Sequence, residues 1–190
     1  MSAPSFRRSR RLTARLLMLS VAAAAAVTAS WSSAATADNR AAQASFTIGS
    51  TVSPFITVAV AGGSTAVGAG IVVHDVLAEG QPTDGRNRWI KIGQPNGAFL
   101  LQNVKSRLCV QSGFFDPTVL RQFPCAFNEP PVTIIYQRWK KVGVDPVRPA
   151  QGRITNGGGL TWDLAGATWG SNVIQSTVQP GKPSQTFRLP

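Results

Sequence analysis

The sequence predicts an all-β domain made of three similar repeats of about 48 residues, with about twelve short strands in all. The first observation is a triplet of an amide, any residue and an aromatic, found at Asn87-Arg88-Trp89, Gln137-Arg138-Trp139 and Gln185-Thr186-Phe187. Its aromatic residues are 50 and then 48 residues apart. The second is that runs rich in Val, Ile, Thr and Phe alternate with polar residues, which favours strands over helices. The third is the frequency of turn residues, with 18 Gly and 13 Pro.

Each repeat contains four expected strands in the same order. The first strands of the three repeats are expected at residues 46–48, 99–103 and 153–156, and the second strands at 56–62, 108–111 and 160–166. The third strands are expected at 71–76, 120–125 and 173–178. The fourth strand of each repeat follows its triplet. Four strands cannot bury their own apolar face, so the repeats 45–93, 94–142 and 143–190 must share one core. We expect Trp89, Trp139 and Phe187 in that core, and Trp162 to point inward because it alternates with Thr161 and Asp163.

Residues 1–37 have the order of a secretory signal peptide. They contain five arginines and no acidic residue, followed by an apolar stretch at residues 16–27 and an A-x-A-type cleavage site at Ala35-Thr36-Ala37. Twelve apolar residues rise only about 18 Å as a helix, short of the ~30 Å core of a bilayer. We therefore expect export, with residues 38–44 as a short linker and the Sec route as the default over twin-arginine export. The expected location is secreted and extracellular.

Leaving out this predicted leader lowers the formal net charge of the chain. The whole chain carries a formal charge of +11, whereas residues 38–190 contain 14 basic and 8 acidic residues, a charge of +6. Their basic residues are spread along the chain, with no cluster of the kind that nucleic-acid binding requires. We expect a protein that binds no nucleic acid, that is not held in a membrane after cleavage, and that is a monomer.

The repeats resemble the ricin B-type lectin domain, with its Q-x-W motifs, over essentially all of residues 38–190. Gln137-Arg138-Trp139 matches the motif fully, while the triplets at Asn87 and Gln185 match with conservative replacements. Residues 103–109 resemble the N…S-x-C-L opening of the family's repeats, which contains the first cysteine. The resemblance implies a β-trefoil with pseudo-threefold symmetry, in which six strands form a barrel closed by three hairpins.

The two cysteines, Cys109 and Cys125, lie where this family places a disulfide within one repeat. Export, an even cysteine count and two strands of one expected hairpin also favour the bond. Two buried free thiols, or a catalytic thiol served by His74 of another repeat, are the alternatives. At the corresponding places repeats one and three carry no cysteine but Thr57 with Val76 and Thr161 with Val178.

In the family each repeat can hold a sugar with an Asp, an aromatic residue and the polar groups of the Q-x-W motif. Repeat three keeps Asp163 and Gln185, has Ser176 at the aromatic position, and carries Trp169 on the intervening loop as another stacking face. Repeat two keeps the aromatic residue, Phe123, and the motif amide, Gln137, which follows Tyr136. Gln111 stands at its Asp position, and Asp116 lies in the nearby loop. Repeat one has Ala59, His74 and Asn87 at the three positions. No repeat holds the complete set.

Each of these residues also has a purely structural interpretation. The motif amides can satisfy buried backbone groups, Asp163 can bond to a local turn, and Phe123 can face the core. We expect His74 to be a surface residue without a task.

Three functions are compared. The predicted function is a secreted carbohydrate-binding, lectin-like module with degenerate sugar sites, whose partner is an extracellular glycan or polysaccharide. The alternative is a trefoil binding protein of another kind, such as a protease inhibitor, with residues 126–133 as a protruding loop. An enzyme is disfavoured because no catalytic or phosphate-binding motif occurs. No cofactor and no metal are expected.

Overall fold

The computed structural model describes residues 44–127, 135–144 and 146–190. The predicted leader and all but the last residue of the predicted linker lie outside these residues. Thirteen strands of the described residues join in one sheet, with three short 3-10 turns (η1 Ala61–Gly63, η2 Pro95–Gly97 and η3 Pro183–Gln185) and one four-residue helix. The all-β class is therefore confirmed, and no helix within the described residues is long and apolar enough to cross a membrane.

The strands recur in the order expected for the repeats. Repeat one contains β1 (Gly49–Ser50), β2 (Ile56–Val60), β3 (Ile71–Asp75) and β4 (Trp89–Gly93). Repeat two contains β5 (Phe99–Asn103), β6 (Cys109–Gln111), β7 (Thr118–Val119), β8 (Arg121–Phe123) and β9 (Trp139–Val142). Repeat three contains β10 (Gln151–Asn156), β11 (Thr161–Leu164), β12 (Val173–Ser176) and β13 (Phe187–Arg188).

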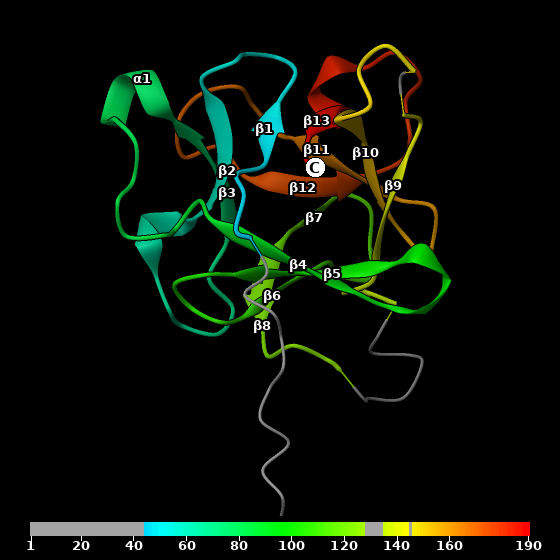
Figure 1. The fold of residues 1–190 in the computed structure, drawn as a ribbon, viewed down its shortest axis with the longest axis horizontal. Coiled ribbons are helices and arrows are strands. Elements are labelled where there is room, and N and C mark those ends of the chain that lie inside the picture. Colours follow the sequence, from blue (N-terminus) through cyan, green and yellow to red (C-terminus); the bar gives the residue numbers. More distant parts are fainter. Residues whose placement is uncertain (1–43, 128–134, 145) are drawn as a thin grey trace, which may run out of the picture. The chain divides into compact units, whose positions relative to one another are not determined.

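The first and last strands of the repeats close into a six-stranded barrel (Figure 1). Between repeats, β4 pairs with β5, β9 with β10, and β13 with β1. Within repeats, β5 pairs with β9 and β10 with β13, while Phe46 bridges to Trp89 just before β1 begins. Because every barrel strand has a neighbour on both sides, the barrel has no open edge.

The middle strands form three hairpins: β2 with β3, β6 with β8, and β11 with β12. Their registers are equivalent, because Thr57 faces His74, Cys109 faces Phe123 and Thr161 faces Ser176. The hairpins also contact one another, through β7 against β12 and single bridges from Gly70 to Arg121 and from Val72 to Asn172. This is the barrel-and-hairpin arrangement of a β-trefoil.

One apolar core runs through all three repeats. Trp89, Trp139 and Phe187 are fully buried in it, as predicted, and so is Trp162. The ring of Trp162 meets Trp139 at 5.3 Å and Phe187 at 5.9 Å, both edge to face. This edge-to-face geometry is favourable for aromatic pairs, so the indole of Trp162 joins the aromatic residues of repeats two and three.

The third strand of repeat one is one residue shorter than the alternation predicted. It ends at Asp75, whose carboxylate accepts hydrogen bonds from the backbone N–H groups of Leu77 and Ala78. These bonds cap the short helix α1 (Val76–Glu79). Val76 therefore starts a helix instead of extending β3.

Candidate functional site

The shared hairpin register defines one candidate site in each repeat. The Asp position lies near the end of the second strand, the aromatic position on the third strand, and the amide position two residues before the fourth strand. These positions are Ala59, His74 and Asn87 in repeat one, Gln111, Phe123 and Gln137 in repeat two, and Asp163, Ser176 and Gln185 in repeat three.

In repeat three the predicted residues Asp163 and Gln185 come together in a buried polar cluster. Asp163 lies on β11 and is 2% exposed. Its Oδ2 accepts hydrogen bonds from Lys182 Nζ at 2.7 Å, Ser176 Oγ at 3.0 Å and Gln185 Nε2 at 3.2 Å. Gln185 is fully buried, and its Oε1 accepts a hydrogen bond from the backbone N–H of Gln179 at 2.7 Å. The cluster therefore fixes the Asp163 side chain in one orientation.

This cluster keeps Asp163 ionised. Burial alone raises its pKa, because a low-dielectric environment disfavours the charged form. The hydrogen bonds from Lys182, Gln185 and Ser176, together with the nearby Ser184 hydroxyl, outweigh that effect, so the pKa of Asp163 lies below its usual range. Repeat three thus holds a carboxylate that is charged at neutral pH.

The other carboxylate oxygen of Asp163 is not used in the same way. Oδ1 is buried and has no hydrogen-bond partner among the described residues. Lys182 is much more exposed than the carboxylate, with 37% of its side chain accessible against 3% for Asp163. Trp169 is 61% exposed and lies on the loop between β11 and β12, the strands that carry Asp163 and Ser176. Repeat three therefore combines a fixed carboxylate, a cation and an exposed indole.

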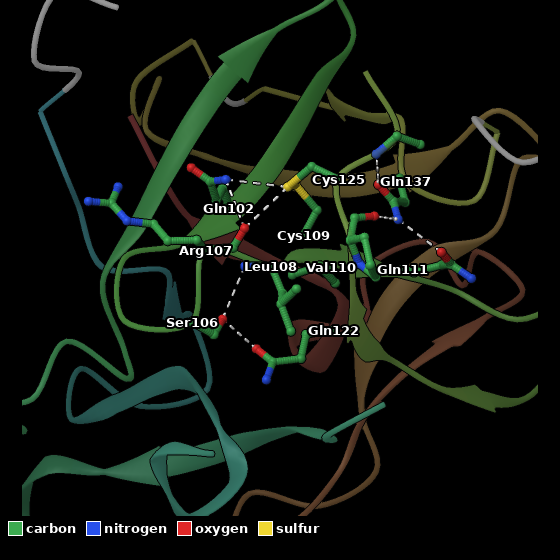
Figure 2. Close-up of a disulfide and its surroundings, with 12 residues drawn as sticks. Gln102, Ser106, Arg107, Leu108, Cys109, Val110, Gln111, Gln122, Cys125 and Gln137 are labelled. Carbon is green, nitrogen blue, oxygen red and sulfur yellow. Dashed lines mark hydrogen bonds between the residues drawn. A yellow bond between two sulfur atoms is a disulfide. The ribbon is translucent and has the colours of Figure 1, made fainter. Parts of the chain in front are cut away.

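In repeat two the equivalent positions form a neutral network instead (Figure 2). Gln137 is 1% exposed, and its Nε2 donates to Gln111 Oε1 and to the carbonyl of Pro124, both at 2.9 Å. Its Oε1 accepts a hydrogen bond from the backbone N–H of Ala126 at 2.9 Å. The motif amide of repeat two is fully used in holding the chain, and no charged group stands at this position.

The predicted disulfide lies beside this network. Cys109 and Cys125 are joined at an S–S distance of 2.03 Å, which confirms the bond and excludes a free thiol at either residue. Gln102 Nε2 lies 3.4 Å from the sulfur of Cys125 and donates to the carbonyl of Arg107 at 2.9 Å (Figure 2). The disulfide and the Gln102 side chain together fill this side of repeat two.

Of the aromatic residues of repeat two, Phe123 lies on β8, whereas Phe114 and Tyr136 lie in segments between strands. Phe123 is half-buried, and Tyr136 lies 4.4 Å from the ring of Phe114, which is 70% exposed. Asp116 does not join the repeat-two network. Its Oδ2 accepts hydrogen bonds from the backbone N–H at 3.0 Å and the hydroxyl of Thr177, on repeat three. The structure thus brings Asp116 to the edge of the repeat-three strand that carries Ser176.

Repeat one has no site of this type. Ala59 replaces the acid, and Asn87 is 1% exposed with no hydrogen bond from its amide to the described residues. The expectation that His74 is a surface residue is wrong, since it is 4% exposed. Its Nδ1 lies 3.2 Å from the Glu79 carboxylate and its Nε2 3.0 Å from the carbonyl of Gly80. Helix α1 folds back over β3 and buries the ring, which sequence alternation alone did not indicate.

Sequence reasoning missed the amides that join one repeat to the next. Gln122 Nε2 donates to the carbonyls of Ser64 and Ala66 at 3.0 and 2.8 Å, in repeat one. Gln175 Nε2 donates to the carbonyls of Gly113 and Phe115 at 2.8 and 2.9 Å, in repeat two. Gln122 and Gln175 occupy the same position in the third strand of their repeats. An alignment of the repeats could therefore have identified them. Lys182 was also missed, because it lies in an irregular segment without periodicity.

The remaining functional predictions concern other parts of the chain. Most of the loop at residues 126–133, the basis of the protease-inhibitor alternative, lies outside the described residues. Within the described ranges, no three His, Cys, Asp or Glu residues lie close enough together to hold a metal ion.

Neither any protein-family model nor any curated protein sequence matches this chain. Solved structures do match. The designed threefold-symmetric protein ThreeFoil has a TM-score of 0.64 at 17% identity, over 76% of this chain and 96% of its own. The C-half of an earthworm R-type lectin, solved with GalNAc, has a TM-score of 0.54 at 17% identity over 75% and 95% of the two chains. A ricin B-like lectin of Macrolepiota procera, solved with lactose, has a TM-score of 0.57 at 16% identity over 77% and 94%.

This chain spans only part of some longer proteins that it matches, 29% and 17% of the length of two of them. The likeness lies in the fold, since the identities are below 20% throughout. The barrel, the three hairpins and these structural matches confirm the architecture implied by the Q-x-W motifs: the chain folds as a β-trefoil.

Proposed function

We propose that the protein is a secreted carbohydrate-binding protein that holds a sugar at the repeat-three site and performs no catalysis. The leader pattern of residues 1–37 supports export. Lectins of the same fold, from earthworm and from Macrolepiota procera, were solved with GalNAc and with lactose. The observation that carries the proposal is the ionised Asp163 carboxylate, with one oxygen unpartnered among the described residues.

The chemistry of this cluster suits a pair of sugar hydroxyls. A carboxylate accepts hydrogen bonds from hydroxyls, and an ammonium group donates to hydroxyl oxygens. Asp163 Oδ1 has free acceptor capacity, and Lys182 has further N–H donors beyond the one directed at Oδ2. Because Oδ1 is buried, the proposal requires that a neighbouring side chain shift for a hydroxyl to reach the carboxylate, and Lys182 is more exposed than Asp163. Trp169 supplies an exposed ring of the kind that packs against the C–H face of a pyranose.

A glycan array probed with the purified protein tests this proposal. The wild-type protein should be retained on a subset of glycans, and Asp163→Asn, which preserves the shape but removes the charge, should abolish retention. Asp84→Asn is the matched control. Asp84 is also a carboxylate paired with cations, Arg86 at 3.0 Å and Lys105 at 2.8 Å, but it lies in repeat one. Failure of the wild type to bind any glycan on a broad array, or unchanged binding by Asp163→Asn, would overturn the proposal.

A further inference from the structure

Repeat one contains a pocket where repeat two contains the disulfide. The equivalent residues follow from the strand registers. Gly49 faces Arg188 just as Gln102 faces Ile90, and Thr57 faces His74 just as Cys109 faces Phe123. Val76 lies two residues after His74, and Cys125 lies two residues after Phe123, so Val76 and Cys125 are equivalent. Repeat one therefore lacks both the Gln102 side chain and the disulfide.

The space left by these replacements is an open pocket of about 300 Å3. Gly49, Thr57, Val76 and Arg188 all line it, and these are the positions at which the two repeats differ. The pocket therefore lies where the side chains of repeat one differ from those of repeat two. It shares no residue with the Asp163 cluster, so it is independent of the function proposed above.

The Arg188 guanidinium is held in place inside this pocket. A Cβ atom at Gly49 would come within 3.1 Å of both Nε and Nη2 of Arg188, so the guanidinium packs directly on the glycine backbone. Nη2 donates to the carbonyl of Ser53 at 3.1 Å. In the part of the chain that the structure describes, no carboxylate forms an ion pair with Arg188. The pocket therefore presents a fixed positive charge with free N–H donors.

The rest of the lining is suited to a sugar ring. Thr47, Thr57 and Gln81 contribute hydroxyl and amide groups, which bond to hydroxyls. Phe55 also lines the pocket and is 44% exposed, so its ring can pack against apolar C–H groups. An arginine fork binds a carboxylate through two parallel hydrogen bonds.

We propose that this pocket binds a carboxylate-bearing sugar, such as a uronic acid residue, with Arg188 on the carboxylate and Phe55 beside the ring. The formal charge of +6 on residues 38–190 favours the approach of such an anionic ligand.

An NMR titration of the purified protein with D-glucuronate tests the proposal. The amides of Gly49 and Thr57 and the Nε–H of Arg188 should shift on binding, a readout that requires no variant. D-Glucuronamide, which keeps the ring but loses the charge, should bind about tenfold more weakly or less. Acetate and inorganic phosphate, which keep a charge but lose the ring, should also bind at least about tenfold more weakly.

Two variants and one control complete the test. Arg188→Gln removes the charge, and Gly49→Gln places in the pocket the side chain that fills it in repeat two. Each should weaken glucuronate binding about tenfold or more. Arg121→Gln should bind as the wild type does, because Arg121 makes a similar hydrogen bond to a loop carbonyl, that of Gly68 at 2.8 Å, outside the pocket.

Either of two results would overturn the proposal. One is an absence of shifts at Gly49, Thr57 and Arg188 on adding glucuronate. The other is binding of glucuronamide, acetate or phosphate as tight as that of glucuronate, which would indicate a neutral-sugar site or a simple anion site instead. Because the pocket shares no residue with the Asp163 cluster, neither result bears on glycan binding at Asp163.

Discussion

Repeats two and three occupy equivalent parts of one fold and use the same positions differently. In repeat two Gln111 and Gln137 bond to each other and to the backbone, beside the Cys109–Cys125 disulfide. In repeat three Asp163 and Gln185 form a charged cluster with Lys182, and one carboxylate oxygen has no partner among the described residues. The change from Gln111 to Asp163, together with the Ser176 and Lys182 side chains, thus separates a site that stabilises the chain from one that has capacity left for a ligand.

The largest expected effect comes from removing the disulfide of repeat two. The double variant Cys109→Ser with Cys125→Ser should lower the free energy of unfolding by ~3 kcal/mol, because the bond restricts the unfolded chain across a separation of 16 residues. Urea denaturation measures the change, and wild-type protein unfolded in dithiothreitol should give the same value. Glycan retention by the folded variant should persist. An unchanged unfolding midpoint would show that repeat two is not stabilised in this way.

The motif amide of repeat two should be the next most sensitive position. Gln137→Ala leaves the N–H of Ala126 and the carbonyl of Pro124 without their hydrogen bonds, which costs about 1–3 kcal/mol in buried surroundings. The exposed Gln179 provides the control, because Gln179→Ala should alter stability by less than about 0.5 kcal/mol. Chemical denaturation of both variants gives the comparison, and equal stabilities would contradict a structural role for Gln137.

The charge in repeat three should appear as a dependence of stability on pH. Because folding lowers the pKa of Asp163, the folded state binds its proton more weakly than the unfolded state does. The resulting stabilisation is complete above the unfolded pKa of about 4 and is lost as the pH falls below it toward the folded pKa. Denaturation midpoints at pH 7 and pH 3 should therefore differ less in Asp163→Asn than in the wild type. The same difference in both proteins would contradict the ionised cluster.

The smallest effect on stability is expected at Trp169. Its side chain is 61% exposed, so Trp169→Ala should change the free energy of unfolding by less than about 0.5 kcal/mol. Loss of a stacking ring should nevertheless weaken glycan binding about 2- to 10-fold. Isothermal calorimetry with a glycan retained on the array measures this. Unchanged affinity would remove Trp169 from the site while leaving Asp163 in it.

The fold could be predicted because its signal is repeated three times. The spacing of Trp89, Trp139 and Phe187 and the alternating runs between them are consequences of one shared core, and the structure buries all three residues in it. The disulfide could be predicted for a similar reason, because two cysteines on one hairpin of a chain with a predicted export signal leave few alternatives.

The site could be predicted only in part, because its geometry depends on segments without periodicity. Lys182, the closest partner of Asp163, lies in a Gly- and Pro-containing loop. Burial of His74 depends on helix α1, which has only four residues and is capped by the Asp75 side chain. The pocket of Arg188 depends on Gly49, a residue without a side chain, and becomes visible only when the strand registers show what Gln102 does in repeat two. Sequence patterns report which faces are buried, whereas these features depend on which loops meet.

The most direct test of the account is to locate a bound sugar on the protein by NMR. The purified protein is titrated with the neutral glycan that it retains most strongly on the array, so that the Arg188 pocket makes no charge-based contribution. We expect the largest amide shifts at Asp163, Ser176 and Gln185, with Gln111, Phe123 and Gln137 unchanged. Shifts centred on repeat two, or none at Asp163 under saturating glycan, would contradict the assignment of binding to repeat three.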